Sequence, residues 1–286
     1  MQNDTVKNLL NKYGIKPQKR LGQNFLIDES VLEKIIAASE LSKDDVILEI
    51  GPGLGILTIE LAKRVKRVIA VEKDKTLYRA LENILEEQKI NNIEMLNEDV
   101  LQISNYSNLP NCSKYKIVAN LPYYIVSPVI RMFLENPPLG GKPEFMILMV
   151  QKEVAQRICA RPGQMSILAV AVQFYAQPKI VSEVLKTSFY PQPKVDSAVI
   201  KITPRINTNP ITNNREFDTG KFFGLVRAGF AHKRKLLISN VSGKIKNQKS
   251  KIKIIFNDAG IAPTARAENL SIENWINLYE KIKNNL

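Results

Sequence analysis

Short apolar segments alternate with amphipathic segments along the first half of this 286-residue chain, and this alternation constrains the fold more than any other feature. Apolar runs of strand length occupy 46–50, 67–72, 93–96, 116–119 and 145–150. Apolar residues at helical spacing predict helices behind a cap at Asp28, at 56–66, near 77–85 and near 127–135. Strands and helices that alternate in this way predict an α/β fold with a doubly wound, mostly parallel sheet.

The pattern changes beyond residue 150. Two apolar stretches, 168–176 and 196–203, flank a loop rich in proline and aromatic residues, and we expect them to be antiparallel strands that close the sheet. Residues 205–215 are typical of a linker. Helical spacing then returns at 217–230, 235–241, 252–259 and 272–282. We therefore expect two domains, with the sheet in residues 1–205 and a small all-helical domain in residues 206–286.

Positive charge is concentrated near the C-terminus. The whole chain has a formal net charge of +13, and residues 201–286 carry 16 Lys and Arg against 6 Asp and Glu, a net charge of +10. A basic domain of this kind favours a polyanionic partner, and nucleic acid is the partner that fits best. A basic surface kept only for solubility is the alternative.

Other features of the sequence exclude whole classes of protein. There is no uncharged apolar stretch of about 18 residues, so we expect no membrane span. The first residues lack the apolar core of a secretory signal, and Cys112 and Cys159 are far apart, which favours a cytoplasmic protein with reduced thiols. With one histidine, His232, and no cysteine cluster, we expect no metal site.

The loop after the first strand contains Gly51, Gly53 and Gly55. Glycines at this position allow a tight turn and a close approach of the backbone to a ligand. Their spacing differs from the Gly-X-Gly-X-X-Gly fingerprint of dinucleotide sites. The neighbouring Glu49 suits a cation better than a diphosphate, which favours S-adenosylmethionine over NAD.

Two acids at the ends of the next strands strengthen this interpretation. Glu72 ends the second strand, where a carboxylate can accept hydrogen bonds from both hydroxyls of a ribose. Asp99 follows the third strand, where an acid can contact an adenine amino group. Strand-end acids that merely face water are the alternative. With the glycine loop, these acids predict an S-adenosylmethionine site.

The segment Asn120, Leu121, Pro122 and Tyr123 follows the strand at 116–119. The Asn120 side-chain oxygen and the Leu121 carbonyl can accept hydrogen bonds from an exocyclic amino group. Pro122 stiffens the turn, and Tyr123 can stack on a flat ring. The segment therefore favours binding of an amino-bearing base, although ordinary turn chemistry uses similar residues.

Five features occurring in order resemble the ribosomal RNA small-subunit adenine N6-dimethyltransferase family: 23–26, 49–55, Glu72, 120–123 and 189–198. The resemblance runs from about Lys19 to Leu278. It implies an enzyme that dimethylates two adjacent adenosines in a hairpin loop near the 3′ end of small-subunit rRNA. It also implies the S-adenosylmethionine-dependent, Rossmann-like methyltransferase fold, acting as a monomer on an immature 30S particle.

The resemblance also assigns roles to residues. Residues implied in cofactor binding are Asn24, Leu26, Gly51, Gly53, Gly55, Glu72, Asp99 and Asn120. The segment 120–123 would carry the catalytic chemistry, with Tyr123 and Phe189 stacking on the two faces of the target base. A core position for Phe189 is the alternative. Lys233, Arg234 and Lys235, together with the lysines in 244–253, would bind phosphates without reading sequence.

Two departures and three alternatives accompany the resemblance. The turn at 161–166 is shorter than in relatives, and His232 stands where relatives often have an amide.

A large-subunit rRNA adenine N6-methyltransferase conferring antibiotic resistance shares the 120–123 motif, but 193–198 favours the small subunit. A catalytically idle nucleic-acid-binding factor is disfavoured by the intact Glu72 and Asn120, and an NAD-dependent dehydrogenase by the glycine spacing.

Overall fold

The computed structural model describes residues 2–102, 114–139, 141–205, 217–242 and 252–283. The chain divides into two compact units, Met1–Ala155 with Pro178–Pro204, and Gln156–Gln177 with Arg205–Leu286. The second unit thus includes 156–177 in addition to the expected C-terminal domain. Most of the expected linker, Cys112 and all but one of the lysines in 244–253 lie outside the described residues.

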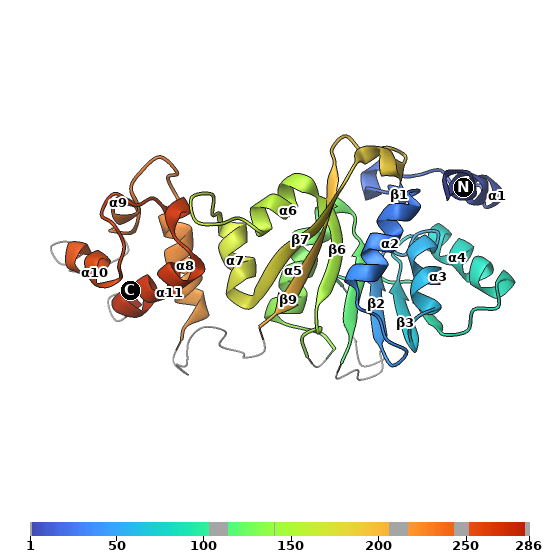
Figure 1. The fold of residues 1–286 in the computed structure, drawn as a ribbon, viewed down its shortest axis with the longest axis horizontal. Coiled ribbons are helices and arrows are strands. Elements are labelled where there is room, and N and C mark those ends of the chain that lie inside the picture. Colours follow the sequence, from blue (N-terminus) through green and yellow to red (C-terminus); the bar gives the residue numbers. More distant parts are fainter. Residues whose placement is uncertain (1, 103–113, 140, 206–216, 243–251, 284–286) are drawn as a thin grey trace. The chain divides into compact units, whose positions relative to one another are not determined.

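A seven-stranded sheet forms the centre of the first unit (Figure 1). Its strand order is β4-β3-β2-β5-β6-β9-β7, and neighbouring strands from β4 to β6 run parallel. The strands are β2 (Val46–Ile50), β3 (Arg67–Val71), β4 (Ile93–Leu96), β5 (Lys116–Asn120), β6 (Met146–Gln151), β7 (Ala176–Val184) and β9 (Ser197–Pro204). The expected mostly parallel sheet is therefore confirmed.

The order of the strands creates a crevice. The chain runs outward from β2 through β3 to β4 and then returns to β5 on the other side of β2. Loops that leave the carboxyl ends of β2 and β5 consequently diverge, and ligands of open α/β sheets bind at such a switch point. A separate two-stranded sheet, β1 (Phe25–Leu26) with β8 (Phe189–Tyr190), is antiparallel.

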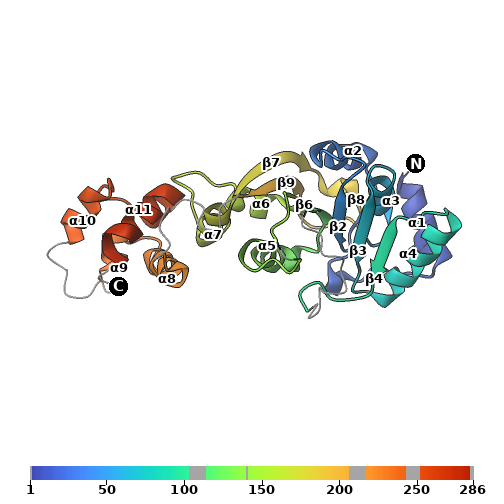
Figure 2. The same ribbon diagram turned by 90° about the horizontal axis from the view of Figure 1, so that it is seen from below.

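Helices cover both faces of the sheet. Figure 2 shows α2 and α3 on one side of the strands and α5 on the other. On the α2 and α3 side, Val31 and Leu61 share a hydrophobic core with Val68 and Val118. The helices of this unit are α1 (Gln2–Lys12), α2 (Glu29–Ala38), α3 (Ile56–Ala62), α4 (Lys75–Glu87) and α5 (Val126–Glu135), with short turns η1 (Lys19–Leu21), η3 (Tyr123–Ile125) and η4 (Lys186–Ser188).

Helix α2 begins as the sequence predicts. The Asp28 carboxylate accepts hydrogen bonds from the backbone N–H groups of Ser30 and Val31, which satisfies donors that the first turn leaves free. Asp74 caps α4 in the same way. Both caps hold the loops that precede them, and these loops border the crevice.

The prediction of a strand at 168–176 is wrong, because most of this stretch forms helix α7 (Ile167–Tyr175). The Ser166 hydroxyl caps it by accepting a hydrogen bond from the Ala169 N–H. The run is almost entirely apolar, so it has no periodicity that could separate a buried helix from a buried strand. The unpredicted β7 follows it, and β9 pairs antiparallel with β6 as expected.

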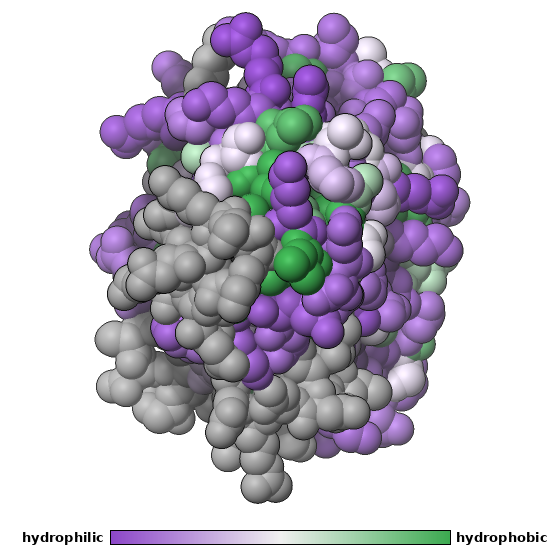
Figure 3. Space-filling view, turned by 90° about the vertical axis from the view of Figure 1, so that its left-hand side faces the viewer, coloured by the Kyte–Doolittle hydropathy of each residue, from purple (hydrophilic) through white to green (hydrophobic). Residues whose placement is uncertain are grey.

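The second unit is built from short helices around an aromatic core. They are α7, α8 (Thr219–Gly229), α9 (Leu237–Val241), α10 (Ile252–Asp258) and α11 (Ile272–Ile282), with the turn η5 (Ala267–Asn269); α6 (Lys152–Ile158) spans the boundary between the units. Phe174 of α7 stacks on Phe222 of α8, and both rings lie in the same hydrophobic core as Trp275. This common core explains why 156–177 belongs to this unit. The described surface at its α9 and α10 end is mainly hydrophilic (Figure 3).

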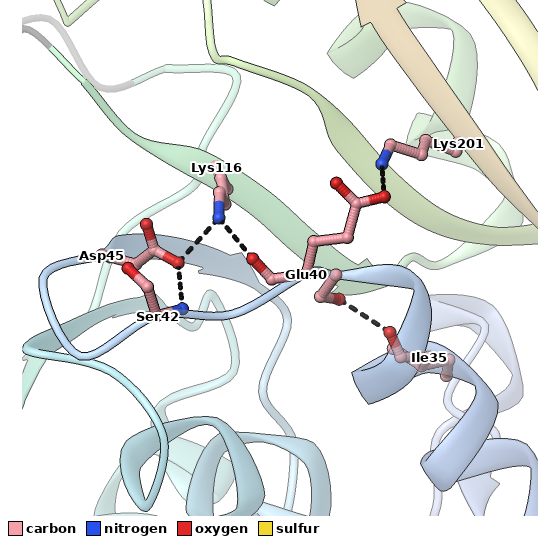
Figure 4. A network of polar contacts seen from close by, with 7 residues as sticks. Ile35, Glu40, Ser42, Asp45, Lys116 and Lys201 are labelled. Carbon is pink, nitrogen blue, oxygen red and sulfur yellow. Dashed lines mark hydrogen bonds and ion pairs between the residues drawn. The ribbon is translucent and has the colours of Figure 1, made fainter.

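A polar network closes the edge of the sheet opposite the crevice (Figure 4). The Lys116 ammonium at the start of β5 donates to the Asp45 carboxylate at 2.7 Å and to the Glu40 carbonyl at 2.8 Å. Lys201 of β9 donates to the Glu40 carboxylate at 2.6 Å. The network ties the segment between α2 and β2 to strands β5 and β9.

Candidate active site

A cavity lies at the carboxyl ends of β2, β3 and β5. Five chain segments line it: 21–26, 49–54, 71–74, 98–100 and 120–125, together with Ile56, Leu57 and Leu77. Thus all predicted cofactor residues except Gly55 border the same cavity, and so do the four residues of the 120–123 segment. The structure brings the proposed cofactor loop and the proposed target loop together, although 65 or more residues separate them in sequence.

The glycines of the loop have different tasks. Gly51, Gly53 and Gly55 have φ values of 70°, 60° and 82°, in the region that favours glycine. Gly51 and Gly53 line the cavity, whereas Gly55 does not. A Cβ on Gly55 would lie 2.3 Å from Cδ1 of Leu81, so this glycine permits close packing of the loop against α4.

Glu72 is buried and anchored at the end of β3. Its Oε1 accepts a hydrogen bond from the Asp74 N–H at 2.8 Å, and its Oε2 accepts one from the Gly53 N–H at 3.1 Å. Burial is the largest influence and raises the pKa of Glu72, although these hydrogen bonds oppose it. The carboxylate therefore stands fixed at the wall of the cavity beside the glycine loop.

Glu49 lies at the end of β2 and is 1% exposed. Its Oε2 atom accepts no hydrogen bond from the described residues. Burial is the largest cause that raises the pKa of Glu49; the neighbouring Thr58 hydroxyl opposes it and the nearby Glu72 carboxylate adds to it, and the pKa is about 8. A buried acceptor of this kind is costly unless a partner arrives, so Glu49 fits a cationic ligand. The sequence already favoured a cation beside Glu49, although the resemblance did not include Glu49 among the residues implied in cofactor binding.

Asp99 lies at the rim, where it forms an ion pair with Lys73 at 2.8 Å. The Asp99 Oδ1 also accepts a hydrogen bond from the Leu101 N–H at 3.0 Å. Burial alone would raise the pKa of Asp99, but the hydrogen bonds from Lys73 and Leu101 outweigh it and lower the pKa. Asp99 is thus an anionic acceptor at the mouth of the cavity.

The segment 22–26 connects the two halves of the cavity. At one end, the Gln23 side chain donates to the Asp74 carboxylate at 2.9 Å. At the other, the Asn120 Nδ2 donates to the Asn24 carbonyl at 3.2 Å. Because the Asn120 nitrogen is occupied, its Oδ1 is the end left to accept, and it accepts no hydrogen bond within the described part of the chain.

Two hydrogen bonds hold the segment 120–123 in place. The Ile125 N–H donates to the Pro122 carbonyl, which closes the turn after Asn120. The Tyr123 hydroxyl and the Ser197 hydroxyl are 2.8 Å apart and hydrogen-bonded. Burial raises the pKa of Tyr123, so the phenol is neutral at ordinary pH. A neutral, fixed aromatic ring is suited to stacking on a base.

The remaining predicted substrate residues lie elsewhere. Phe189 does not line the cavity; it is 3% exposed and packs in the core that also contains Val31 and Leu61. Lys233, Arg234 and Lys235 belong to the second unit, where all three are exposed and none forms an ion pair with a described residue. Three unpaired cations in sequence can bind phosphates.

Residues 14–284 match the family model described as ribosomal RNA adenine dimethylase. The chain is 44% identical over 271 residues to ribosomal RNA small subunit methyltransferase A of Dehalococcoides mccartyi, and the aligned region spans 94% of this chain and 90% of that protein. It is 40% identical over 288 residues to the protein of the same name from Bacillus licheniformis, spanning 97% and 95%.

Two solved structures have a similar fold. The 23S rRNA methyltransferase ErmE gives a TM-score of 0.72 at 27% identity, covering 91% of this chain and all of its own. A dimethyladenosine transferase from Plasmodium falciparum also gives 0.72, at 26% identity, covering 91% of this chain and 98% of its own. The similarity therefore includes both units of the chain. Among the described residues, no helix is both long and apolar enough to cross a membrane.

Proposed function

The chain belongs to the ribosomal RNA adenine dimethylase family, and from this premise we propose that it dimethylates N6 of two adjacent adenosines in small-subunit (16S) rRNA. The proposed methyl donor is S-adenosylmethionine. The proposed target lies in the 3′-terminal hairpin loop of the rRNA within an immature 30S particle, and we propose a monomer acting in the cytoplasm. Names of the similar curated proteins support the small subunit, because they specify it at 44% and 40% identity.

The single observation that carries the chemistry is the orientation of Asn120. Its amide nitrogen donates to the Asn24 carbonyl, which leaves the Oδ1 as the acceptor beside the cavity. An amino group of adenine donates hydrogen bonds but is a poor nucleophile, because its lone pair is delocalised into the ring. Acceptance by Asn120 and by the Leu121 carbonyl would favour a pyramidal nitrogen whose lone pair is free to attack.

S-adenosylmethionine, when bound, supplies the activated methyl group. Glu72 would accept hydrogen bonds from its ribose hydroxyls, Asp99 from its adenine amino group, and Glu49 would face its cationic methionine end. The unpartnered buried oxygen of Glu49 supports this fit, because a cation would supply the missing partner. Tyr123 would hold the target base flat, and positioning of this kind supplies much of the rate.

The large-subunit alternative shares the fold. ErmE has the same TM-score as the dimethyladenosine transferase, so shape alone does not separate the two substrates. Sequence identity supports the small subunit, since it is 44% for the Dehalococcoides protein and 27% for ErmE. The buried Glu72 and the oriented Asn120 support an active enzyme over an idle nucleic-acid-binding factor.

Asn120→Ala tests the proposal in a single-turnover reaction with labelled S-adenosylmethionine and immature 30S particles. We expect the rate to fall about 100-fold or more, because an oriented group at the reacting atom is lost, while folding and RNA binding persist. Mass spectrometry of digested rRNA should show dimethyladenosine at two neighbouring positions for the wild type, with monomethyladenosine transient.

Two results would contradict the proposal. A folded Asn120→Ala protein with the wild-type rate would refute the role of Asn120. Label that the wild type transfers only to large-subunit rRNA would refute the proposed substrate. A wild-type reaction that ends at monomethyladenosine would refute the proposed product. Glu72→Ala is the companion variant, in which S-adenosylmethionine affinity should fall about tenfold or more because charged hydrogen bonds are lost.

A further inference from the structure

We propose that Ser197 is a positioning residue for methyl transfer, which holds the Tyr123 ring at the place where it can stack on the target adenine. This inference rests on the proposed function of the cavity. Ser197 lies in the segment 193–198, which the proposed chemistry does not otherwise use. It reaches the site from β9, 74 residues away from Tyr123 in sequence.

The contact between the two hydroxyls is short and sheltered. The Ser197 Oγ and the Tyr123 Oη are 2.8 Å apart. Ser197 has no exposed surface, whereas Tyr123 lines the cavity. A buried hydroxyl is costly unless it is hydrogen-bonded, so each hydroxyl stabilises the other in this position.

The sheet gives Ser197 a fixed place. Ser197 pairs with Gln151 at the first position of β9, next to the Ala198 and Val150 pair. The preceding Asp196 is also tied down, because its carboxylate accepts from the Lys186 N–H at 2.9 Å and its carbonyl accepts from the Lys152 N–H at 3.0 Å. The hydroxyl that holds Tyr123 therefore projects from an anchored part of the molecule.

The geometry of Tyr123 explains why this anchor matters. Pro122 and the turn closed by Ile125 fix the backbone, but the ring can still rotate about its side-chain bonds. A hydrogen bond at the far end of the ring fixes where the ring lies, because Oη moves when the side chain turns about its Cα–Cβ bond. Stacking requires the ring to lie against the face of the base, so the Ser197 bond places the ring before the base arrives and lowers the cost of ordering it.

A double-mutant cycle of Ser197→Ala and Tyr123→Phe tests the inference, because phenylalanine keeps the ring and removes only the hydroxyl. We expect each single variant to lower the single-turnover methylation rate by about three- to tenfold, the scale of one hydrogen bond. We expect S-adenosylmethionine affinity to be unchanged. If Ser197 acts only through the Tyr123 hydroxyl, Ser197→Ala will have no further effect in the Tyr123→Phe protein.

The matched control is Ser182→Ala, since the buried Ser182 hydroxyl on β7 has no hydrogen-bond partner among the described residues; the rate of this variant should equal that of the wild type. Wild-type rates in both single variants, or a full additional loss in the double variant, would overturn the inference. If Ser197→Ala does not fold, Tyr123→Phe alone decides, because an unchanged rate there removes any role for the bond. A wild type inactive on small-subunit rRNA would instead refute the proposed function.

Discussion

Glu49 couples the proposed cofactor site to pH. Its carboxyl is buried beside the glycine loop, and burial raises its pKa to about 8, so that it is largely protonated at neutral pH without a ligand. A cation bound beside Glu49 would favour the ionised form. Binding must then release the proton, and by linkage the affinity rises with pH as long as the proton is bound in the free protein.

We therefore predict that the Kd of S-adenosylmethionine falls as pH rises toward about 8, by at most about tenfold per pH unit for one proton, and levels off above it. Isothermal titration calorimetry in buffers of different ionisation enthalpy measures the proton release directly. Glu49→Gln is the control, which should bind more weakly and release no proton at this residue. Identical proton release in both proteins would show that another group is responsible.

Single residues differ in how far the sequence could predict them. Glu72 follows β3, Asn120 ends β5 and Asp99 lies in the loop after β4. Strand ends of a parallel sheet meet at one edge, so the place of these residues at the cavity was predictable. Ser197 was not, because its partner lies 74 residues away and nothing in the local pattern identifies it. The roles proposed for the site residues remain predictions.

Phe189 and Gly55 show what a sequence motif could not predict. Both belong to segments that carry the family resemblance, yet Phe189 packs in the core and Gly55 packs against α4. A motif shows which residues occur together, but it does not separate residues that contact a ligand from those that support its wall.

At the scale of elements, packing in the second unit depends on a close approach between helices. Gly229 ends α8, and a Cβ there would lie 2.4 Å from Cη2 of Trp275 and 2.8 Å from Cδ1 of Leu237. Trp275 and Leu237 have no exposed surface, so neither has room to move aside. The absence of a side chain at Gly229 is therefore what allows α8, α9 and α11 to share one core.

We predict that Gly229→Ala lowers the free energy of unfolding of this unit by about 1–3 kcal/mol, the usual cost of overpacking a core. Gly224→Ala is a matched control in the same helix, because a Cβ there meets nothing within 4 Å. It should be neutral or stabilising, since alanine is the better helix former. Urea unfolding followed by Trp275 fluorescence measures both, and equal stability of the two variants would contradict the packing argument.

Most elements were predicted well, and one was not. Strands β2 and β4 and helix α11 have the predicted bounds. Helix α7 was mistaken for a strand since nearly all its residues are apolar. Tertiary packing, which local sequence does not encode, decided its conformation.

At the scale of the whole molecule, charge and chemistry are divided between the two units. The cavity lies in the first unit, while the last 86 residues carry a net charge of +10. Phosphate contacts provide affinity without sequence preference, whereas base contacts provide selection. We infer that the second unit contributes mainly affinity for RNA, and the cavity contributes mainly the choice of base.

Lys233, Arg234 and Lys235 allow this division to be measured, because they are exposed and form no ion pair with described residues. Replacing all three with Gln should reduce the slope of log affinity for rRNA against log salt by up to about 2.1–2.7, since each phosphate contact contributes about 0.7–0.9 to the slope. S-adenosylmethionine affinity should not change.

The matched variant replaces Lys34, Lys66 and Lys89, three exposed lysines of the first unit, and so alters net charge equally. Its slope should remain near that of the wild type, because charge placed away from bound phosphates releases no counterions. Equal slopes for the two triple variants would mean that net charge, and not a phosphate-binding segment at 233–235, determines RNA affinity.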